Sequence, residues 1–196
     1  MSNTREKTLM LTRMGIFTAI VIVLQLIAAM LARAGIFTVS LVLVPIVIGS
    51  ALYGWKAGTW LGFVFGVVVL LTDAGFFLSI NVFGTIVVCL LKGMLAGAAA
   101  AAVYKLLENK NRWVAILAAA VVCPIVNTGV FLLGCALFFY DTIAELAEGT
   151  GYENVGLYMI VGFVGINFLF EFAANLVLSP VVLRLLNIVK KPAVQA

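Results

Sequence analysis

The stretch LVLVPIVIGSALYGWKAGTWLGFVFG, residues 41–66, gives the clearest indication of how this chain folds. It lies within two uncharged apolar runs, Ile36 to Tyr53 and Ala57 to Leu71, which are separated by a short break at Gly54, Trp55 and Lys56. A helix needs roughly 20 apolar residues to cross a bilayer, and short cationic loops are retained in the cytoplasm. The stretch therefore predicts a membrane hairpin whose turn, at Lys56, faces the cytoplasm.

Glycines recur at every fourth position along this hairpin, at Gly54, Gly58, Gly62 and Gly66. Because residues four apart share one face of a helix, the second limb of the hairpin presents a face without side chains. Small residues at such spacing let two membrane helices approach closely. We expect this face mainly to pack against another helix.

The composition extends the same conclusion to the whole chain. Apolar residues make up 65% of the 196 residues, charged residues only 10%, and the mean hydropathy is +1.24. This excludes a soluble domain, and the long uninterrupted apolar runs favour helices over the alternating pattern of a membrane barrel. We predict an all-α integral membrane protein with a single transmembrane domain, residues 1–196, and short cytoplasmic tails at 1–8 and 189–196.

Six transmembrane helices are expected from the uncharged runs. They are Met14 to Ala32, Ile36 to Tyr53, Ala57 to Leu71, Val82 to Leu107, a run after Trp113 that ends at Phe139, and Val155 to Ile188. Nearly all lysines and arginines then lie inside, with Arg33 outside and Lys92 within a span, which places both termini in the cytoplasm. Two alternatives remain open, a cleavable secretory signal at the start of the chain and a re-entrant third helix.

Polar side chains are rare within these spans. They are Gln25 in the first span, Lys92 in the fourth, Asn127 in the fifth, and Asn167, Glu171 and Asn175 in the sixth. A charged residue at the bilayer centre costs roughly 2.5 to 3.5 kcal/mol even on insertion scales, so each one needs a partner or a role. The three polar residues of the sixth span are spaced by four and share one helix face.

Two interpretations of this polar set compete. In the first, Lys92 pairs with Glu171 and the asparagines form a structural hydrogen-bond network between helices. In the second, the same groups form a chamber open to the outside that holds a water-soluble ligand, with Lys92 meeting an anionic or carbonyl group. Buried ionisable residues in membranes favour a functional role as the default hypothesis.

Several function classes find no support in the sequence. The chain has no histidine, no metal-binding or hydrolase motif and no phosphate-binding loop, so we predict no cofactor, no metal site and no enzymatic activity. Any ATP hydrolysis would take place on separate partner subunits. The net charge of +4 comes from residues at span ends and does not imply nucleic acid as a partner. A stand-alone secondary transporter or channel, with Lys92 and Glu171 as an ion relay, is the alternative function.

The segment TVSLVLVPIVIGSALYGWKAGTWLGFVFG, residues 38–66, resembles the second and third helices of the substrate-binding S components of energy-coupling factor (ECF) vitamin transporters. The basic N-terminal segment with Gly15 and Ala19 is similar to the small-residue motif by which the first helix of these proteins docks on a shared transmembrane subunit. Length, helix number and cytoplasmic termini agree with this family.

The resemblance implies a vitamin-binding subunit of a prokaryotic plasma membrane importer, assembled with a transmembrane coupling subunit and two ATP-binding subunits. It implies a gate formed by the loop residues Ile36, Phe37, Thr38 and Ser40, and a pocket that includes Lys92, Asn127, Asn167 and Glu171. Partner docking is expected at Gly15, Ala19, Gly58 and Gly62. A buried lysine suits a carboxylate, so pantothenate is the first candidate ligand, followed by riboflavin and folate.

Overall fold

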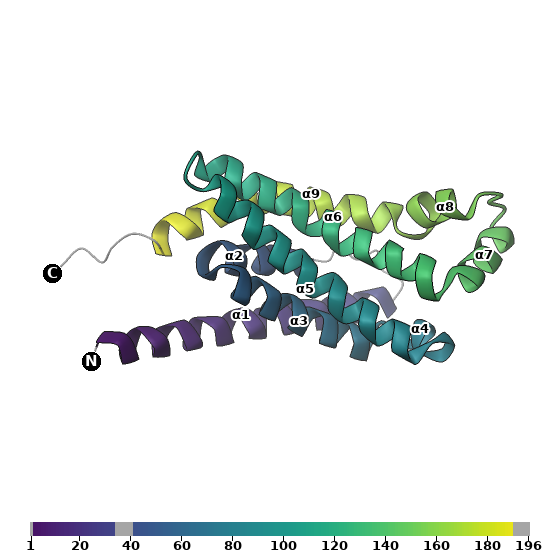
Figure 1. The fold of residues 1–196 in the computed structure, drawn as a ribbon, viewed down its shortest axis with the longest axis horizontal. Helices are drawn as coiled ribbons and strands as arrows, with labels where there is room; N and C mark the ends of the chain where they lie inside the picture. Colours follow the sequence, from purple (N-terminus) through teal and green to yellow (C-terminus); the bar gives the residue numbers. More distant parts are fainter. Residues whose placement is uncertain (1, 34–40, 190–196) are drawn as a thin grey trace.

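The computed structural model describes residues 2–33 and 41–189, and the regular elements in these ranges are helices joined by short turns (Figure 1). The α-helices, with one π-helical turn before the last of them, are α1 (Ser2–Arg33), α2 (Leu43–Tyr53), α3 (Trp55–Thr72), α4 (Gly75–Ile80), α5 (Val82–Leu107), α6 (Arg112–Phe138), α7 (Tyr140–Gly149), α8 (Val155–Leu157), the turn η1 (Tyr158–Phe163) and α9 (Gly165–Val189).

Among the described residues, 5 helices are long and apolar enough to cross a membrane, namely α1, α3, α5, α6 and α9. The all-α membrane fold is therefore confirmed. The second predicted span differs in length, because its described helix α2 has 11 residues. A helix of that length covers only about 16 Å at 1.5 Å per residue. Almost all of α2 is buried among the other helices, so it is a short apolar sixth helix.

Other predicted boundaries also need correction. Helix α1 begins well before Met14 and includes the polar N-terminal segment. The segment between the predicted third and fourth spans contains the short helix α4, and the segment between the fifth and sixth spans contains α7. The last span is not continuous, because the π-helical turn interrupts it before α9. The proposed gate residues Ile36, Phe37, Thr38 and Ser40 lie outside the described residues.

Local chemistry explains several helix ends. Gly54 separates α2 from α3 and has a φ of 81°, a left-handed conformation that glycine adopts without a Cβ penalty. Asn81 caps α5 by accepting a hydrogen bond from the N–H of Gly84 at 2.9 Å. Asn111 caps α6 by accepting one from the N–H of Trp113 at 2.8 Å. These caps satisfy backbone donors that would otherwise lack a partner at the helix start.

A glycine seam joins α3 to α5 and forms the tightest part of the bundle. Gly58 faces the backbone of Gly97, and Gly62 faces that of Gly93, so closely that a Cβ on any of the four would collide with backbone atoms. The expected helix-packing role of the glycine face is confirmed. Gly58 and Gly62 are both buried against α5 within the chain itself, and their expected docking role stays a prediction.

Helix α1 lies at the side of the bundle and contacts it along one stripe. Its buried residues, among the side chains described, are Val21, Gln25 and Ala29, which are spaced by four. Gly15 and Ala19 are exposed, and nothing lies within 4 Å of the place of a Cβ at Gly15. The start of α1 and the end of α9 lie at one end of the bundle, whereas α4, α7 and α8 lie at the other end (Figure 1).

Candidate functional site

A cavity of about 610 Å³ lies between α1, α3, α5, α6 and α9. Its walls include Gln25, Ala28, Ala29, Ala32, Arg33, Phe65, Val69, Thr72, Asp73, Gly75, Phe76, Lys92, Asn127, Asn167 and Glu171. A volume of this size falls within the range of roughly 300 to 1,000 Å³ that small-molecule sites occupy. The cavity is therefore large enough to enclose a compact organic ligand.

A second chamber of about 290 Å³ adjoins the first. The two chambers share Lys92, Asn127, Asn167 and Glu171, and the second is further lined by Thr128, Phe131, Phe163, Val164 and Phe168. The first chamber is mainly bounded by α1 and α3, and the second by α6 and the segment around the π-helical turn. The four shared polar residues thus lie where the two spaces meet.

Lys92 contributes its ammonium to both chambers from α5. The Nζ atom lies 5.1 Å from the ring centroid of Phe131 and 5.6 Å from that of Phe65. An ammonium within about 6 Å of an aromatic face is attracted by the ring quadrupole. Two aromatic rings from α3 and α6 therefore hold this charge at the wall of the cavity, where a ligand can reach it.

Asn127 carries a buried polar atom without a partner. Its side chain is 6% exposed and lines both chambers, and its Oδ1 accepts no hydrogen bond within the described part of the chain. Such buried orphan acceptors are rare in folded proteins, because each costs roughly 1 to 3 kcal/mol. A donor group on a bound molecule would remove that cost. The unpaired oxygen of Asn127 is thus a vacant hydrogen-bonding position in the cavity wall.

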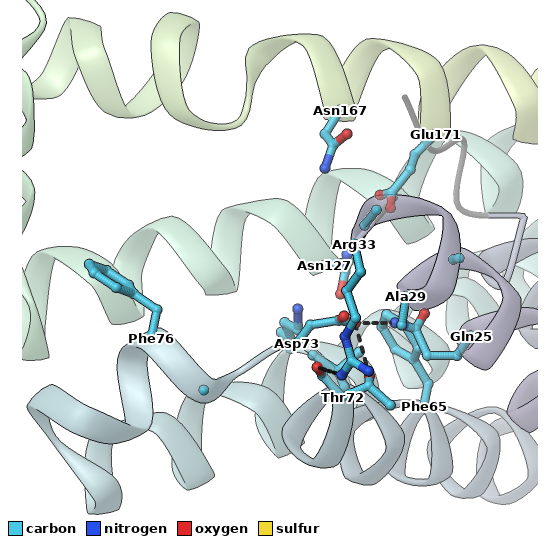
Figure 2. Close-up of a pocket in the computed structure, with 15 residues that line it drawn as sticks. Gln25, Ala29, Arg33, Phe65, Thr72, Asp73, Phe76, Asn127, Asn167 and Glu171 are labelled. Carbon is cyan, nitrogen blue, oxygen red and sulfur yellow. Dashed lines mark hydrogen bonds between the residues drawn. The ribbon is translucent and has the colours of Figure 1, made fainter. Parts of the chain in front are cut away.

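Asn167 and Glu171 complete the shared polar set from α9. Both side chains point from α9 towards the region of Asn127 (Figure 2). Glu171 is half-buried, whereas Asn167 is exposed. Together with Lys92, these groups offer a cation, a carboxylate and two amides to one space. The sequence prediction had grouped these four residues, and the structure brings them together; an ion pair between Lys92 and Glu171 stays a prediction.

A hydrogen-bonded clamp, consisting of Gln25, Arg33, Thr72 and Asp73, joins α1 to the end of α3 at the rim of the cavity (Figure 2). Gln25, only 5% exposed, donates from Nε2 to Oδ2 of Asp73 at 2.6 Å. The same oxygen accepts from the hydroxyl of Thr72 at 3.0 Å. Arg33 donates from Nη2 to the backbone O of Thr72 at 2.6 Å. Gln25 therefore lines the cavity, as predicted, and binds its neighbour helix.

Sequence reasoning missed several cavity residues and misplaced one. Arg33 and Asp73 are among the missed residues, although their opposite charges at the outer ends of two predicted spans are a signal that these ends could meet. Phe65 and Phe131 gave no signal, because aromatic residues are common in every span. Asn175 was expected in the pocket, but it does not line either chamber. It is 2% exposed, and its Nδ2 donates to the backbone O of Glu171 at 2.9 Å.

The displacement of Asn175 has a geometric reason. Four residues advance an α-helix by slightly more than one turn, so a run spaced by four drifts around the axis. Asn175 has therefore rotated away from the face that carries Asn167 and towards the interior of the bundle. Within the described ranges, no group of three or more histidines, cysteines or acidic residues could hold a metal ion. The arrangement suits reversible binding of a polar organic molecule.

Comparison with known protein families assigns most of the chain to a family. The family model described as the ECF transporter, substrate-specific component, matches residues 9–183. Neither the curated proteins nor the solved structures contain a match. The matched range covers most of the chain and includes every residue that lines the two chambers.

Proposed function

Since the chain belongs to the family of substrate-specific components of ECF transporters, we propose that it binds a carboxylate-bearing, water-soluble vitamin in the two joined chambers. Pantothenate is the first candidate; folate, which also bears carboxylates, and riboflavin, which bears none, are the alternatives to it. Proteins of this family are substrate-binding subunits of transporters and not enzymes. They act with an ECF transmembrane subunit and ATPase subunits, and this chain is a multi-pass membrane protein.

The unpaired Oδ1 of Asn127 is the observation that carries the proposal. It needs a donor from a ligand, while Lys92, which lines the same chambers, offers a cation to an acidic group. Pantothenate has a carboxylate together with an amide N–H and two hydroxyls, so it can supply both interactions at once. Riboflavin offers donors without a carboxylate, and folate is larger, which is why they rank behind it.

The proposed route runs from the outside of a prokaryotic plasma membrane. The rim residues Arg33, Asp73 and Phe76 are exposed and lie at the end of the bundle that bears α4. The connections between α2 and α3, next to Lys56, and between α5 and α6, which contains Lys110, lie towards the opposite end, which the positive-inside rule assigns to the cytoplasm. Docking of the transmembrane subunit is proposed at the exposed face of α1 around Gly15 and Ala19.

Binding measurements on the purified chain test the proposal. We expect pantothenate to raise the melting temperature, because a ligand that binds only the folded state stabilises it by mass action. Panthenol, in which a primary alcohol replaces the carboxylate, should bind more weakly. Riboflavin and folate are measured in parallel, so that a larger shift by either would replace pantothenate as the ligand.

The variant Lys92→Met identifies the carboxylate site. It should weaken pantothenate binding about 10- to 100-fold, which corresponds to the loss of a hydrogen bond to a charged group, and leave panthenol binding unchanged. Lys105→Met is the matched control, since Lys105 is an exposed lysine near the end of the same helix. Equal weakening of both ligands by Lys92→Met would show that Lys92 is structural.

Uptake into proteoliposomes separates this proposal from a stand-alone transporter. The chain alone should bind vitamin without importing it, and import should require the transmembrane and ATPase subunits together with ATP. Import by the chain alone under a proton gradient would instead support the ion-relay alternative with Lys92 and Glu171.

A further inference from the structure

The interruption of the last membrane segment is a π-helical turn at Tyr158–Phe163. At its end the N–H of Val164 donates to the carbonyl O of Met159, five residues earlier, at 3.3 Å. Glycine is needed just after it, because a Cβ on Gly165 would lie only 2.8 Å from the carbonyl O of Ile160. A π-helical turn is less stable than regular α-helix and occurs frequently at functional sites. The contacts of its last residue, Phe163, suggest what it does here.

Phe163 is the hub of an aromatic group in the wall of the second chamber. Its ring stacks on Phe131 at 6.0 Å with an interplanar angle of 23°, and on Tyr158 at 6.1 Å and 27°. Phe77 of α4 meets Phe163 edge-on at 6.2 Å and Phe131 edge-on at 5.8 Å. Phe131 is therefore held by rings from two elements outside its own helix.

The far partner of Phe131 is the ammonium of Lys92, 5.1 Å from the ring centroid. A contiguous series of contacts thus runs from the π-helical turn through Phe163 and Phe131 to the charge in the cavity. A regular helix through residues 158–163 would turn Phe163 through a different angle about the axis and remove it from Phe131. The π-helical turn and the placement of Lys92 are connected by these contacts.

We infer that Phe163 is a positioning residue for Lys92: held by the π-helical turn, it fixes the ring of Phe131 and thereby the ammonium at the place where an anionic ligand binds. The preference for an anionic over an uncharged ligand then depends on Phe163, which acts on Lys92 through the ring of Phe131. The ligand half of this inference rests on the proposed function, whereas the placement of Lys92 does not.

Chemical labelling tests the placement without any ligand. The rate of acetylation by an N-hydroxysuccinimide ester is measured at Lys92, relative to Lys105 in the same molecules, by mass spectrometry of peptides. Phe163→Leu should raise the relative rate about two- to fivefold, because release from the rings exposes the amine. Phe163→Tyr keeps a ring and should restore the wild-type rate. Phe163→Met, with similar volume and no ring, is measured as a second variant in case the leucine variant does not fold.

Phe168→Leu is the matched control. Phe168 lines the same chamber, but its ring contact is with Phe172, at 5.7 Å, and not with Phe131. It should therefore leave the labelling rate of Lys92 unchanged. An unchanged rate in both ringless variants at residue 163, or an equal rise in the Phe168 variant, would overturn the inference.

Ligand preference provides the second readout. In the Phe163→Leu variant the ratio of pantothenate to panthenol affinity should fall about two- to fivefold, because the loss for pantothenate includes the displaced ammonium of Lys92 and the loss for panthenol does not. Equal loss of both affinities would show general damage to the chamber and overturn the positioning role. If the wild-type chain does not prefer pantothenate, the proposed ligand is wrong, and the labelling rates alone decide the role of Phe163.

Discussion

Two faces of helix α5 meet the rest of the bundle in opposite ways. Gly93 and Gly97 lie against α3 so closely that no Cβ fits between the helices, whereas Lys92 faces a cavity of about 610 Å³. Lys92 and Gly93 are adjacent in sequence, and a helix places neighbours about 100° apart. One helix therefore closes a seam with one face and lines an open space with the next.

The contrast between these two faces of α5 shows how a bundle of membrane helices can enclose a cavity. Helices α3, α5 and α6 share the most extensive contacts, and α1 and α9 are attached to them less extensively. The cavity lies between this tight group and the two looser helices. We expect ligand entry to move α1 and α9 against α3 and α5, because regions with fewer packed contacts open at lower free energy.

The largest effect is expected in the glycine seam. Gly62→Val places a branched side chain against the backbone of Gly93, which cannot move aside without separating α3 from α5. We expect a loss of about 3 kcal/mol or more in the free energy of unfolding, at the upper end of overpacking effects. Unfolding in a titration with denaturing detergent measures it. Gly15→Val is the control, because open space surrounds residue 15, and it should unfold like the wild type. Equal stability of the two variants would contradict the close contact between α3 and α5.

Gly15, the control position above, can also be tested in the assembled transporter. A larger side chain at residue 15 should obstruct a partner helix without disturbing the fold. We expect Gly15→Leu to weaken association with the transmembrane subunit about tenfold, a cost typical of overpacking, and to leave vitamin affinity unchanged. Copurification at graded subunit concentrations measures this. Normal assembly would show that this face of α1 contacts lipid only.

In the wall of the cavity, Asn127→Leu should weaken ligand binding without lowering the stability of the ligand-free chain. Without ligand, removing the unpaired acceptor should leave the melting temperature unchanged or raise it. Vitamin affinity should fall about five- to tenfold, because one hydrogen bond to the ligand is lost. Thermal unfolding and ligand titration are the two measurements.

Thr59→Val is the control for Asn127→Leu. The hydroxyl of Thr59 is another buried group without a hydrogen-bond partner among the described residues, but it does not line either chamber. Its removal should not affect vitamin affinity. A marked loss of stability in Asn127→Leu would mean that the amide has a structural partner.

The smallest effect is expected in the clamp between α1 and α3. Gln25→Leu removes the hydrogen bond to Asp73 but leaves that exposed carboxylate free to bind water. We expect a loss of about 1 kcal/mol in the free energy of unfolding, as for a typical single hydrogen bond. Thr12→Val, which removes a bond within α1 only, serves as the control. A higher free energy of unfolding in the Gln25 variant would show that burying Gln25 destabilises the fold more than its hydrogen bond stabilises it.

The class of fold and most of the spans follow from the amino-acid sequence alone. The length of an uncharged apolar run is a local property, and the membrane requires backbone hydrogen bonds to be made within each helix. Val82 to Leu107 was therefore predicted with the same bounds as α5, and the break at Gly54 with the right residue. The polar set around Lys92 was also predicted, because a charge within a span is visible without any knowledge of its neighbours.

Which neighbours these residues meet depends on how the helices pack together, which the sequence does not show directly. How far a helix is rotated about its axis depends on every helix packed against it, so Asn175 faces the interior of the bundle and Gly62 faces the backbone of Gly93. The π-helical turn and the ring pair of Phe131 and Phe163 follow no local pattern of apolar residues. The cavity is a property of the gaps between helices, and those gaps are determined by side-chain volumes that lie far apart in the chain.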